Sequence, residues 1–198
     1  STYIDPVTKE KHAPGTFKYY SLAQERYIYT KDPVEVSKTY LMDRDFVLNG
    51  QGNEYQGFSK DTFGGKINIA KDILSSGTNT LAKPMMTILT EAVANDPLLP
   101  GTLTMTDATR VKGEALAKAN PTSAHLMGNA VDFAIKKGNG IDESMSDFFF
   151  QKYAELKDVA RVTLEFPPNH PLAKKYAEKY GDFVSIEQHA TGPHIHIE

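Results

Sequence analysis

Two short stretches of the chain carry the residue types that bind metal ions. Residues 123–132, Ser-Ala-His-Leu-Met-Gly-Asn-Ala-Val-Asp, offer a histidine, His125, and seven positions later a carboxylate, Asp132. The last five residues offer two more histidines, His194 and His196, one residue apart. Histidine and carboxylate are the donors of catalytic zinc sites, in which three protein ligands leave a fourth position open to water. Together the two stretches predict a zinc site.

The strands expected around these residues direct them away from the core. Alternation along a strand sends successive side chains to opposite faces. In residues 129–135 it places the three large apolar side chains on one face, and Asp132 on the other face beside alanines. In residues 194–197 it places both isoleucines toward the core and both histidines toward the site. The metal-binding side chains are therefore expected to share one open surface.

From about residue 66 onward, hydrophobic periodicity predicts a regular succession of helices and strands. The expected helices cover residues 85–93, 112–118, 145–156 and 172–180, and Asp142 or Ser144 is expected to cap the third. The expected strands cover residues 102–106, 129–135, 162–166, 183–187 and 194–197, and the last two are expected to form a hairpin-like pair. This order predicts an α+β fold with a small, largely antiparallel sheet flanked by helices.

Residues 1–67 differ from the rest of the chain in composition. They hold seven of the ten tyrosines and several turn-forming pairs, such as Pro14-Gly15 and Asn49-Gly50. We interpret residues 1–67 as an aromatic-rich N-terminal extension packed on a core of residues 68–198. The alternative is that they form a wall of the substrate groove, because tyrosine combines apolar area with a polar tip.

The overall composition excludes several classes of function. The 198 residues are 40% hydrophobic and 24% charged, as in ordinary globular proteins, and we expect a monomer. A formal net charge of −3 gives no electrostatic case for binding nucleic acid or an anionic membrane. No apolar run approaches the roughly 20 residues of a membrane span, and without cysteine there is no disulfide or thiolate chemistry. The chain begins at Ser1 and not at Met, so export stays open.

A family resemblance rests on the two metal-binding stretches. The pattern Ser-x-His-x-x-Gly-x-Ala-x-Asp, complete at 123–132, followed by a late His-x-His, resembles the zinc D-alanyl-D-alanine carboxypeptidases and L-alanyl-D-glutamate endopeptidases. Hedgehog domains and penicillin-insensitive murein endopeptidases are relatives, and residues 191–196 also resemble the final motif of lysostaphin-type endopeptidases. The resemblance covers about residues 80–198. It implies a hedgehog-like fold and a periplasmic or otherwise exported enzyme that hydrolyses peptidoglycan stem or cross-link peptides, as a carboxypeptidase or an endopeptidase.

The resemblance also implies roles for individual residues. It makes His125, Asp132 and His196 the zinc ligands and places His194 beside the metal as a polar or transition-state-stabilising group; in the lysostaphin-type motif the corresponding histidine assists catalysis. The family carries an arginine after the preceding strand, which here corresponds to Arg110 in a turn whose neighbouring residues differ. A guanidinium at this place suits the binding of a carboxylate or the polarisation of the scissile carbonyl.

The general base and the activity itself stay open at this stage. We rank Glu187 first, His189 second and His194 third as the base, and Glu165 remains a further possibility. Glu187 lies on the expected strand but nine residues before His196, farther than in the relatives. The rival functions are a zinc-binding recognition module without turnover and a peptidase for peptides outside peptidoglycan.

Overall fold

The structure, a computed structural model, describes most of the chain from residue 55 onward and parts of the chain before it. The described residues are 3–4, 8–13, 17–21, 26–30, 40–42, 55–76, 78–110, 123–156, 159 and 161–198. The helix expected over 112–118 lies outside them. The division into an extension of residues 1–67 and a core of residues 68–198 stays a prediction.

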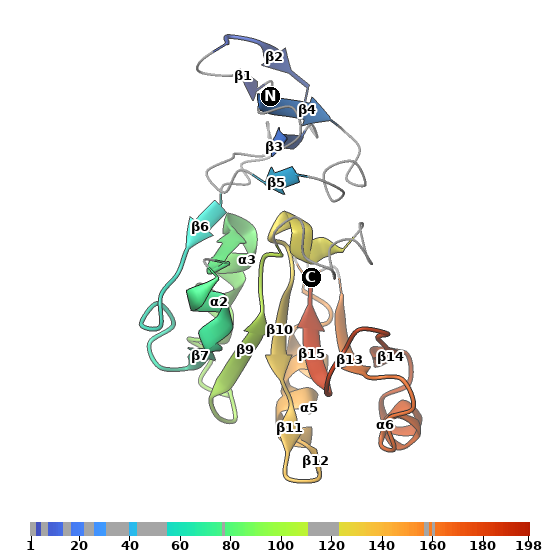
Figure 1. The fold of residues 1–198 in the computed structure, drawn as a ribbon. Coiled ribbons are helices and arrows are strands. Elements are labelled where there is room, and N and C mark those ends of the chain that lie inside the picture. Colours follow the sequence, from blue (N-terminus) through green and yellow to red (C-terminus); the bar gives the residue numbers. More distant parts are fainter. Residues whose placement is uncertain are drawn as a thin grey trace.

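A six-stranded mixed sheet forms the centre of the fold (Figure 1). In spatial order its strands are β14 (Val184–Ile186), β13 (Val162–Phe166), β15 (His194–Ile197), β10 (Val131–Ala134), β9 (Leu103–Asp107) and β7 (Ile67–Ile69). The central pairings of β15 with β13 and β10, and of β10 with β9, are antiparallel. The two outer pairings, β13 with β14 and β7 with β9, are parallel. The predicted α+β class is confirmed, with a sheet that is antiparallel only in its middle.

The expected hairpin of the last two strands is wrong. β13 lies between β14 and β15, and it pairs parallel with the former and antiparallel with the latter. Parallel neighbours need a crossover connection, and the helix α6 (Ala173–Tyr180) with the short η3 (Gly181–Phe183) provides it between β13 and β14. β15 is therefore free to enter the middle of the sheet, so its two histidines lie at the centre and not at an edge.

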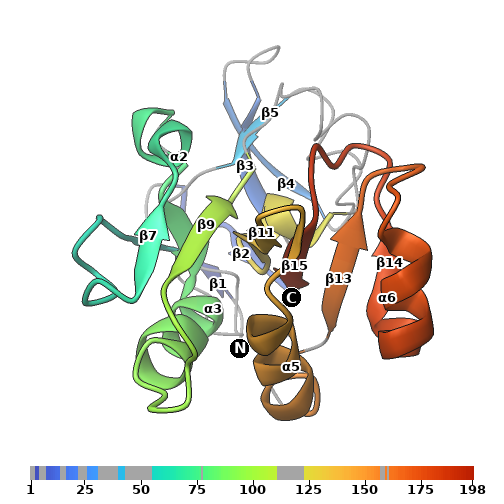
Figure 2. The same ribbon diagram turned by 90° about the horizontal axis from the view of Figure 1, so that it is seen from below.

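The helices α3 (Lys83–Thr87) and α5 (Glu143–Lys152) lie on one face of this sheet (Figure 2). α3 continues into the π-helix η1 (Ile88–Val93), and together they match the helix predicted over 85–93. α5 is capped by Asp142, whose carboxylate accepts a hydrogen bond from the Met145 amide at 3.1 Å. The short helix α2 (Lys71–Ser75) lies beside β7. None of the helices within the described residues is long and apolar enough to cross a membrane.

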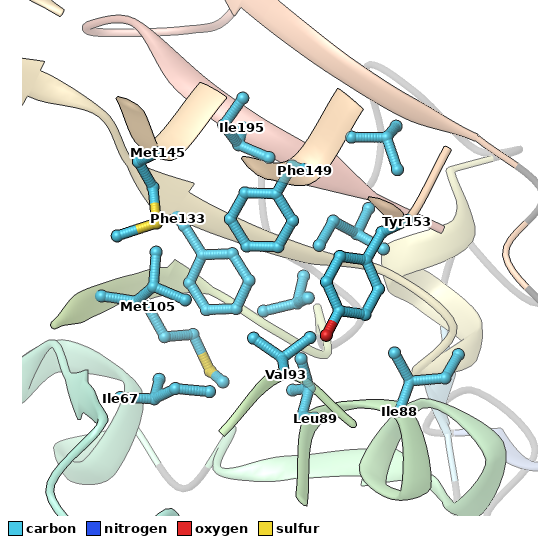
Figure 3. Close-up of a cluster of buried hydrophobic side chains, with 14 of the residues drawn as sticks. Ile67, Ile88, Leu89, Val93, Met105, Phe133, Met145, Phe149, Tyr153 and Ile195 are labelled. Atoms are coloured by element: carbon cyan, nitrogen blue, oxygen red, sulfur yellow. The ribbon is translucent and has the colours of Figure 1, made fainter. Parts of the chain in front are cut away.

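The core lies between the sheet and these helices, as Figure 3 shows. Phe133 of β10 stacks on Phe149 of α5 with ring centroids 5.9 Å apart. The large apolar residues that were expected to face inward from β10 and β15 are fully buried: Val131, Phe133, Ile195 and Ile197. The predicted alternation of both strands is thus confirmed on its apolar side, which leaves the opposite sheet face to the polar residues.

The remaining described strands form small separate ladders. β6 (Tyr55–Gly57) pairs with β8 (Thr80–Ala82), and β11 (Lys136–Lys137) pairs with β12 (Gly140–Ile141) just after β10. Nearer the N-terminus, β1 (Tyr3–Ile4) pairs with β2 (Lys11–His12). There β3 (Phe17–Ser21) lies between β4 (Arg26–Thr30) and β5 (Tyr40–Met42).

Candidate metal centre

His125 is presented by a single turn of 3₁₀-helix, η2 (Ala124–Met127). Ser123 caps this turn, and its hydroxyl accepts a hydrogen bond from the His125 backbone amide at 3.3 Å. The turn ends at Gly128, whose φ of 67° lies in the left-handed region that glycine adopts without a steric penalty. The chain then enters β10 and reaches Asp132. The seven positions from His125 to Asp132 thus contain the rest of the 3₁₀ turn, Gly128 in a left-handed conformation and the start of β10.

Asp132 and His196 are direct cross-strand partners. The antiparallel register of β10 and β15 pairs these two residues, so their side chains leave the sheet on the same face, next to each other. His196 Nδ1 lies 2.9 Å from Asp132 Oδ1, and His125 Nε2 lies 3.3 Å from the same oxygen. The structure therefore brings all three predicted ligands together.

The three side chains form a group that could hold a metal ion. One donor atom from each lies within 4.8 Å of the others, and all three residues are buried. Ligand bonds of about 2.1 Å in a tetrahedron place donor atoms about 3.4 Å apart, close to the observed 2.9 and 3.3 Å. Two imidazoles and one carboxylate also match the ligand types of catalytic zinc. The donor set fits zinc, although it does not by itself identify the metal.

The surroundings of His125 favour a metal-binding tautomer. Its Nδ1 donates to the Ala108 carbonyl at 2.7 Å, which leaves Nε2 as the nitrogen with a free lone pair. This Nε2 is buried and has no hydrogen-bond partner among the described residues. A buried nitrogen without a hydrogen bond is costly, and a cation between His125, Asp132 and His196 would satisfy it.

The electrostatics of the group are those of a cation site. Burial alone would raise the pKa of Asp132, but the imidazoles of His125 and His196 outweigh burial and hold this pKa far below its ordinary value. For His196, burial alone would lower the pKa, but Asp132 and Glu198 raise it above the ordinary value. The carboxylate is therefore fully ionised at neutral pH, and the pocket around it favours positive charge.

A second carboxylate, Glu165, lies directly beside this group. The register of β13 and β15 pairs Glu165 with His194, and Glu165 Oε2 lies 3.2 Å from His194 Nε2. The other carboxylate oxygen, Oε1, lies 3.9 Å from His196 Nδ1 and accepts a hydrogen bond from the Thr163 hydroxyl at 3.1 Å. His194 Nε2 is also 3.7 Å from Asp132 Oδ2. Glu165 and His194 thus form a pair in contact with the candidate ligands.

Both members of this pair carry shifted pKa values. Burial would raise the pKa of Glu165, but the hydrogen bond from His194 and the nearby imidazole of His196 lower it overall. Burial would lower the pKa of His194, but Glu165 and Asp132 raise it overall. Each group therefore stabilises the charged form of the other.

Glu187 and His189, which were ranked first and second as the general base, lie farther out. Both line the cavity over the metal group. Glu187 directly follows the edge strand β14, and its carboxylate accepts a hydrogen bond from the His189 backbone amide at 3.4 Å. Because β13 separates β14 from β15, Glu165 lies one strand closer to the histidines than Glu187 does.

Arg110 lies beside the metal group and is held in place by its neighbours. Its Nε and Nη2 are both 3.0 Å from Asp107 Oδ2, and its Nη1 donates to the Ser123 hydroxyl at 3.2 Å. Its backbone amide donates to the His125 carbonyl at 3.0 Å. A guanidinium has five N–H donors, so these contacts leave part of it for a ligand.

These residues surround an open cavity of about 900 Å³. The three candidate ligands, Arg110 and Glu165 line it, and α2 contributes Asp72 to its wall. Its volume falls within the range of pockets that hold small molecules or peptide segments. The arrangement can hold a cation at its floor and place a substrate above that cation.

Comparison of the chain with models of protein families, with curated proteins and with solved structures finds no match. The geometry of the site and the sequence patterns therefore carry the functional argument.

Proposed function

We propose that the protein is a zinc-dependent peptidase related to the D-alanyl-D-alanine carboxypeptidases and L-alanyl-D-glutamate endopeptidases, with a hedgehog-like fold. The observation that carries the proposal is the convergence of buried His125, Asp132 and His196 on the floor of an open cavity. A structural zinc site has four protein ligands and a closed shell. Three candidate ligands with open space above them favour a catalytic site.

The three candidate ligands have distinct tasks in this proposal. His125 would bind zinc through Nε2, because Ala108 accepts the proton on Nδ1. His196 would bind through Nδ1, which faces Asp132, and the carboxylate of Asp132 would leave the site with a net positive charge. A bound zinc ion supplies a Lewis acid that polarises the scissile carbonyl and activates water near neutral pH.

Glu165 and His194 are our candidates for proton transfer. Glu165 Oε2 would take up the proton of the attacking water, and His194 Nε2, 3.2 Å away, would help to deliver it to the leaving amine. Their contact with the ligand group favours them over Glu187 and His189, which line the cavity farther out. Arg110, oriented by Asp107, would bind a substrate carboxylate or the oxyanion.

The proposed substrates are peptidoglycan stem or cross-link peptides, and the proposed location is the periplasm or the cell envelope. These two proposals rest on the sequence resemblance at 123–132 and 194–196 and not on the cavity. The cavity is compatible with them, because its Arg110 could receive a carboxylate of such a peptide.

Mass analysis of sacculi digested with the purified protein tests this function. We expect new fragments, either released D-alanine or products cut at alanyl-glutamate or cross-link bonds. Chelator treatment and the His125→Ala variant should both abolish these fragments. A zinc-loaded protein that yields no fragments from any sacculus would contradict the proposal and favour a recognition module without turnover. Cleavage of other peptides alone would redirect the proposal to a different substrate.

A further inference from the structure

His125 and His196 present different ring nitrogens to the candidate metal group. His125 directs Nε2 toward Asp132, and its Nδ1 donates to a backbone carbonyl. His196 directs Nδ1 toward Asp132 and Glu165, at 2.9 and 3.9 Å. Its Nε2 therefore points to the other side of the ring, where it is buried without a hydrogen-bond partner among the described residues. A ligand imidazole needs an acceptor for the proton on its second nitrogen.

Glu198 lies on that other side. Residues 196 and 198 are two apart at the end of β15, so their side chains share a face of the strand. Glu198 Oε2 is 3.7 Å from His196 Nε2, whereas Asp132 and Glu165 both face Nδ1. Of the carboxylates in contact with His196 within the described part of the chain, Glu198 is the one on the Nε2 side.

Arg161 fixes the position of the Glu198 carboxylate. Arg161 Nε lies 2.8 Å from Glu198 Oε1, which leaves Oε2 for His196. The backbones of the two residues also exchange both hydrogen bonds at 3.0 Å, which extends the pairing of β13 and β15 by one step. Backbone hydrogen bonds thus hold residue Glu198 against β13, and the Arg161 guanidinium holds its side-chain carboxylate.

We propose that Glu198 is a positioning residue that accepts a hydrogen bond from the Nε2–H group of His196 and so keeps the Nδ1 lone pair directed at the metal. Arg161 anchors Glu198 in this role. The inference rests on the metal site of the proposed function. Carboxylate–histidine–metal arrangements orient the ring and raise ligand basicity, and loss of the outer partner costs about 10- to 100-fold in metal affinity. We expect the 3.7 Å separation to shorten to a hydrogen bond when the metal is bound.

The test measures zinc affinity by competition with a chelator at constant pH. Glu198→Ala should weaken zinc binding about 10- to 100-fold. Glu198→Gln should retain most of the affinity, because its amide oxygen can still accept a hydrogen bond from the Nε2–H group of His196. Asp72→Asn is the matched control, since Asp72 of α2 is a carboxylate that lines the same cavity, and the zinc affinity of this variant should equal that of the wild type. The unfolding free energy of each metal-free variant, measured in parallel, should stay close to that of the wild type.

A second measurement needs no variant. Nitrogen-15 NMR of the zinc-loaded wild type should show His196 with zinc on Nδ1 and a proton on Nε2. Zinc on Nε2 would overturn the inference, as would equal zinc affinity of Glu198→Ala and wild type. An equal loss of affinity in Asp72→Asn would also overturn it, because the effect would then be general electrostatics. If the wild type itself does not bind zinc, the proposed metal site fails, and this outcome is distinct from failure of the positioning role alone.

Discussion

His125 is the residue whose surroundings a bound cation explains most fully. The side chain is only 2% exposed. Because Nδ1 donates its proton to the Ala108 carbonyl, Nε2 carries a lone pair. This lone pair faces the Asp132 carboxylate, which is also an acceptor, so the two atoms form no hydrogen bond. An unsatisfied buried nitrogen costs about 1–3 kcal/mol. A metal ion removes this cost and also neutralises the buried charge of Asp132.

Removal of one ligand therefore tests the site directly. Loss of an outer partner weakens metal binding about 10- to 100-fold, so His125→Ala and Asp132→Ala, which remove a ligand itself, should weaken it by more than that. The metal content of the purified variants, measured by elemental analysis, checks this expectation, and circular dichroism checks that the fold is retained. His189→Ala, which removes an exposed histidine of the same cavity, should keep the wild-type zinc content. A normal zinc content of His125→Ala would remove it from the ligand set.

The identity of the general base can be decided by a pair of matched variants. Glu165→Gln should keep zinc and lose about 10²- to 10⁴-fold in turnover, because an amide is too weak a base to take the proton from the attacking water. Glu187→Gln should keep most of the activity, because its carboxylate lies near β14 and away from the ligands. Steady-state turnover on sacculus fragments is the measurement. The reverse result would return the role to Glu187, as its position in the sequence first indicated.

The sequence allowed the ligands to be predicted better than the base. His125, Asp132 and His196 fall in two short patterns whose residue types alone indicate metal binding. Glu165 belongs to no recognisable pattern, and only the neighbouring position of β13 and β15 brings it to His194. Alternation in 162–166 could have placed Glu165 on the polar face, but alternation carries no information about which strand lies alongside.

At the level of elements, α5 is joined to the end of η1 by a small polar cluster around Asp96. Tyr153, which follows α5, donates its hydroxyl to Asp96 Oδ2 at 2.9 Å, and Lys152 pairs with the same oxygen. The Leu98 amide donates to the other carboxylate oxygen at 2.9 Å. Burial alone would raise the pKa of Asp96, but these donors, Lys152 foremost, hold it below the ordinary value.

This cluster predicts a pH-dependent contribution to stability. Asp96→Asn should lower the unfolding free energy by about 1–3 kcal/mol near neutral pH, since it weakens hydrogen bonds to a charged acceptor. The folded pKa is lowered, so the contribution is complete above the ordinary aspartate pKa of about 3.9 and disappears as the pH falls through the folded value. Urea unfolding of both proteins at several pH values should therefore show a difference that shrinks below about pH 4. Asp72→Asn serves as the control, and a difference for Asp96→Asn that grows toward acid would contradict the argument.

The elements themselves were predicted more accurately than their neighbours. Periodicity placed β9, β10, β13, α5 and α6 close to their observed positions, because burial on one face imposes a local pattern. The expected hairpin of residues 183–187 and 194–197 was wrong, because strand pairing depends on the crossover through α6. The parallel pairing of β13 with β14 was missed for the same reason, whereas the pairing of β7 with β9 was missed because no strand was expected over residues 67–69.

At the scale of the whole molecule, the site depends on the complete sheet. His125, Asp132 and His196 are supplied by a turn and two strands that are far apart in sequence, and β15 must lie between β10 and β13 to join them. Since a preformed group of this kind is absent from an unfolded chain, metal binding free energy adds to folding free energy.

Zinc should therefore stabilise the whole protein, and the gain should grow with the logarithm of the ratio of free zinc to its dissociation constant. Free zinc at 100 times its dissociation constant adds about 2.7 kcal/mol, which for a chain of this size raises Tm by roughly 5–10 °C. Calorimetry with zinc and with excess chelator measures the difference. At a fixed concentration of free zinc the effect should decline as the pH falls, because protons compete with zinc for the His196 imidazole, whose pKa Asp132 and Glu198 raise above its ordinary value. His125→Ala should show no zinc-dependent shift, and an equal shift in that variant would mean that zinc stabilises the fold at some other place.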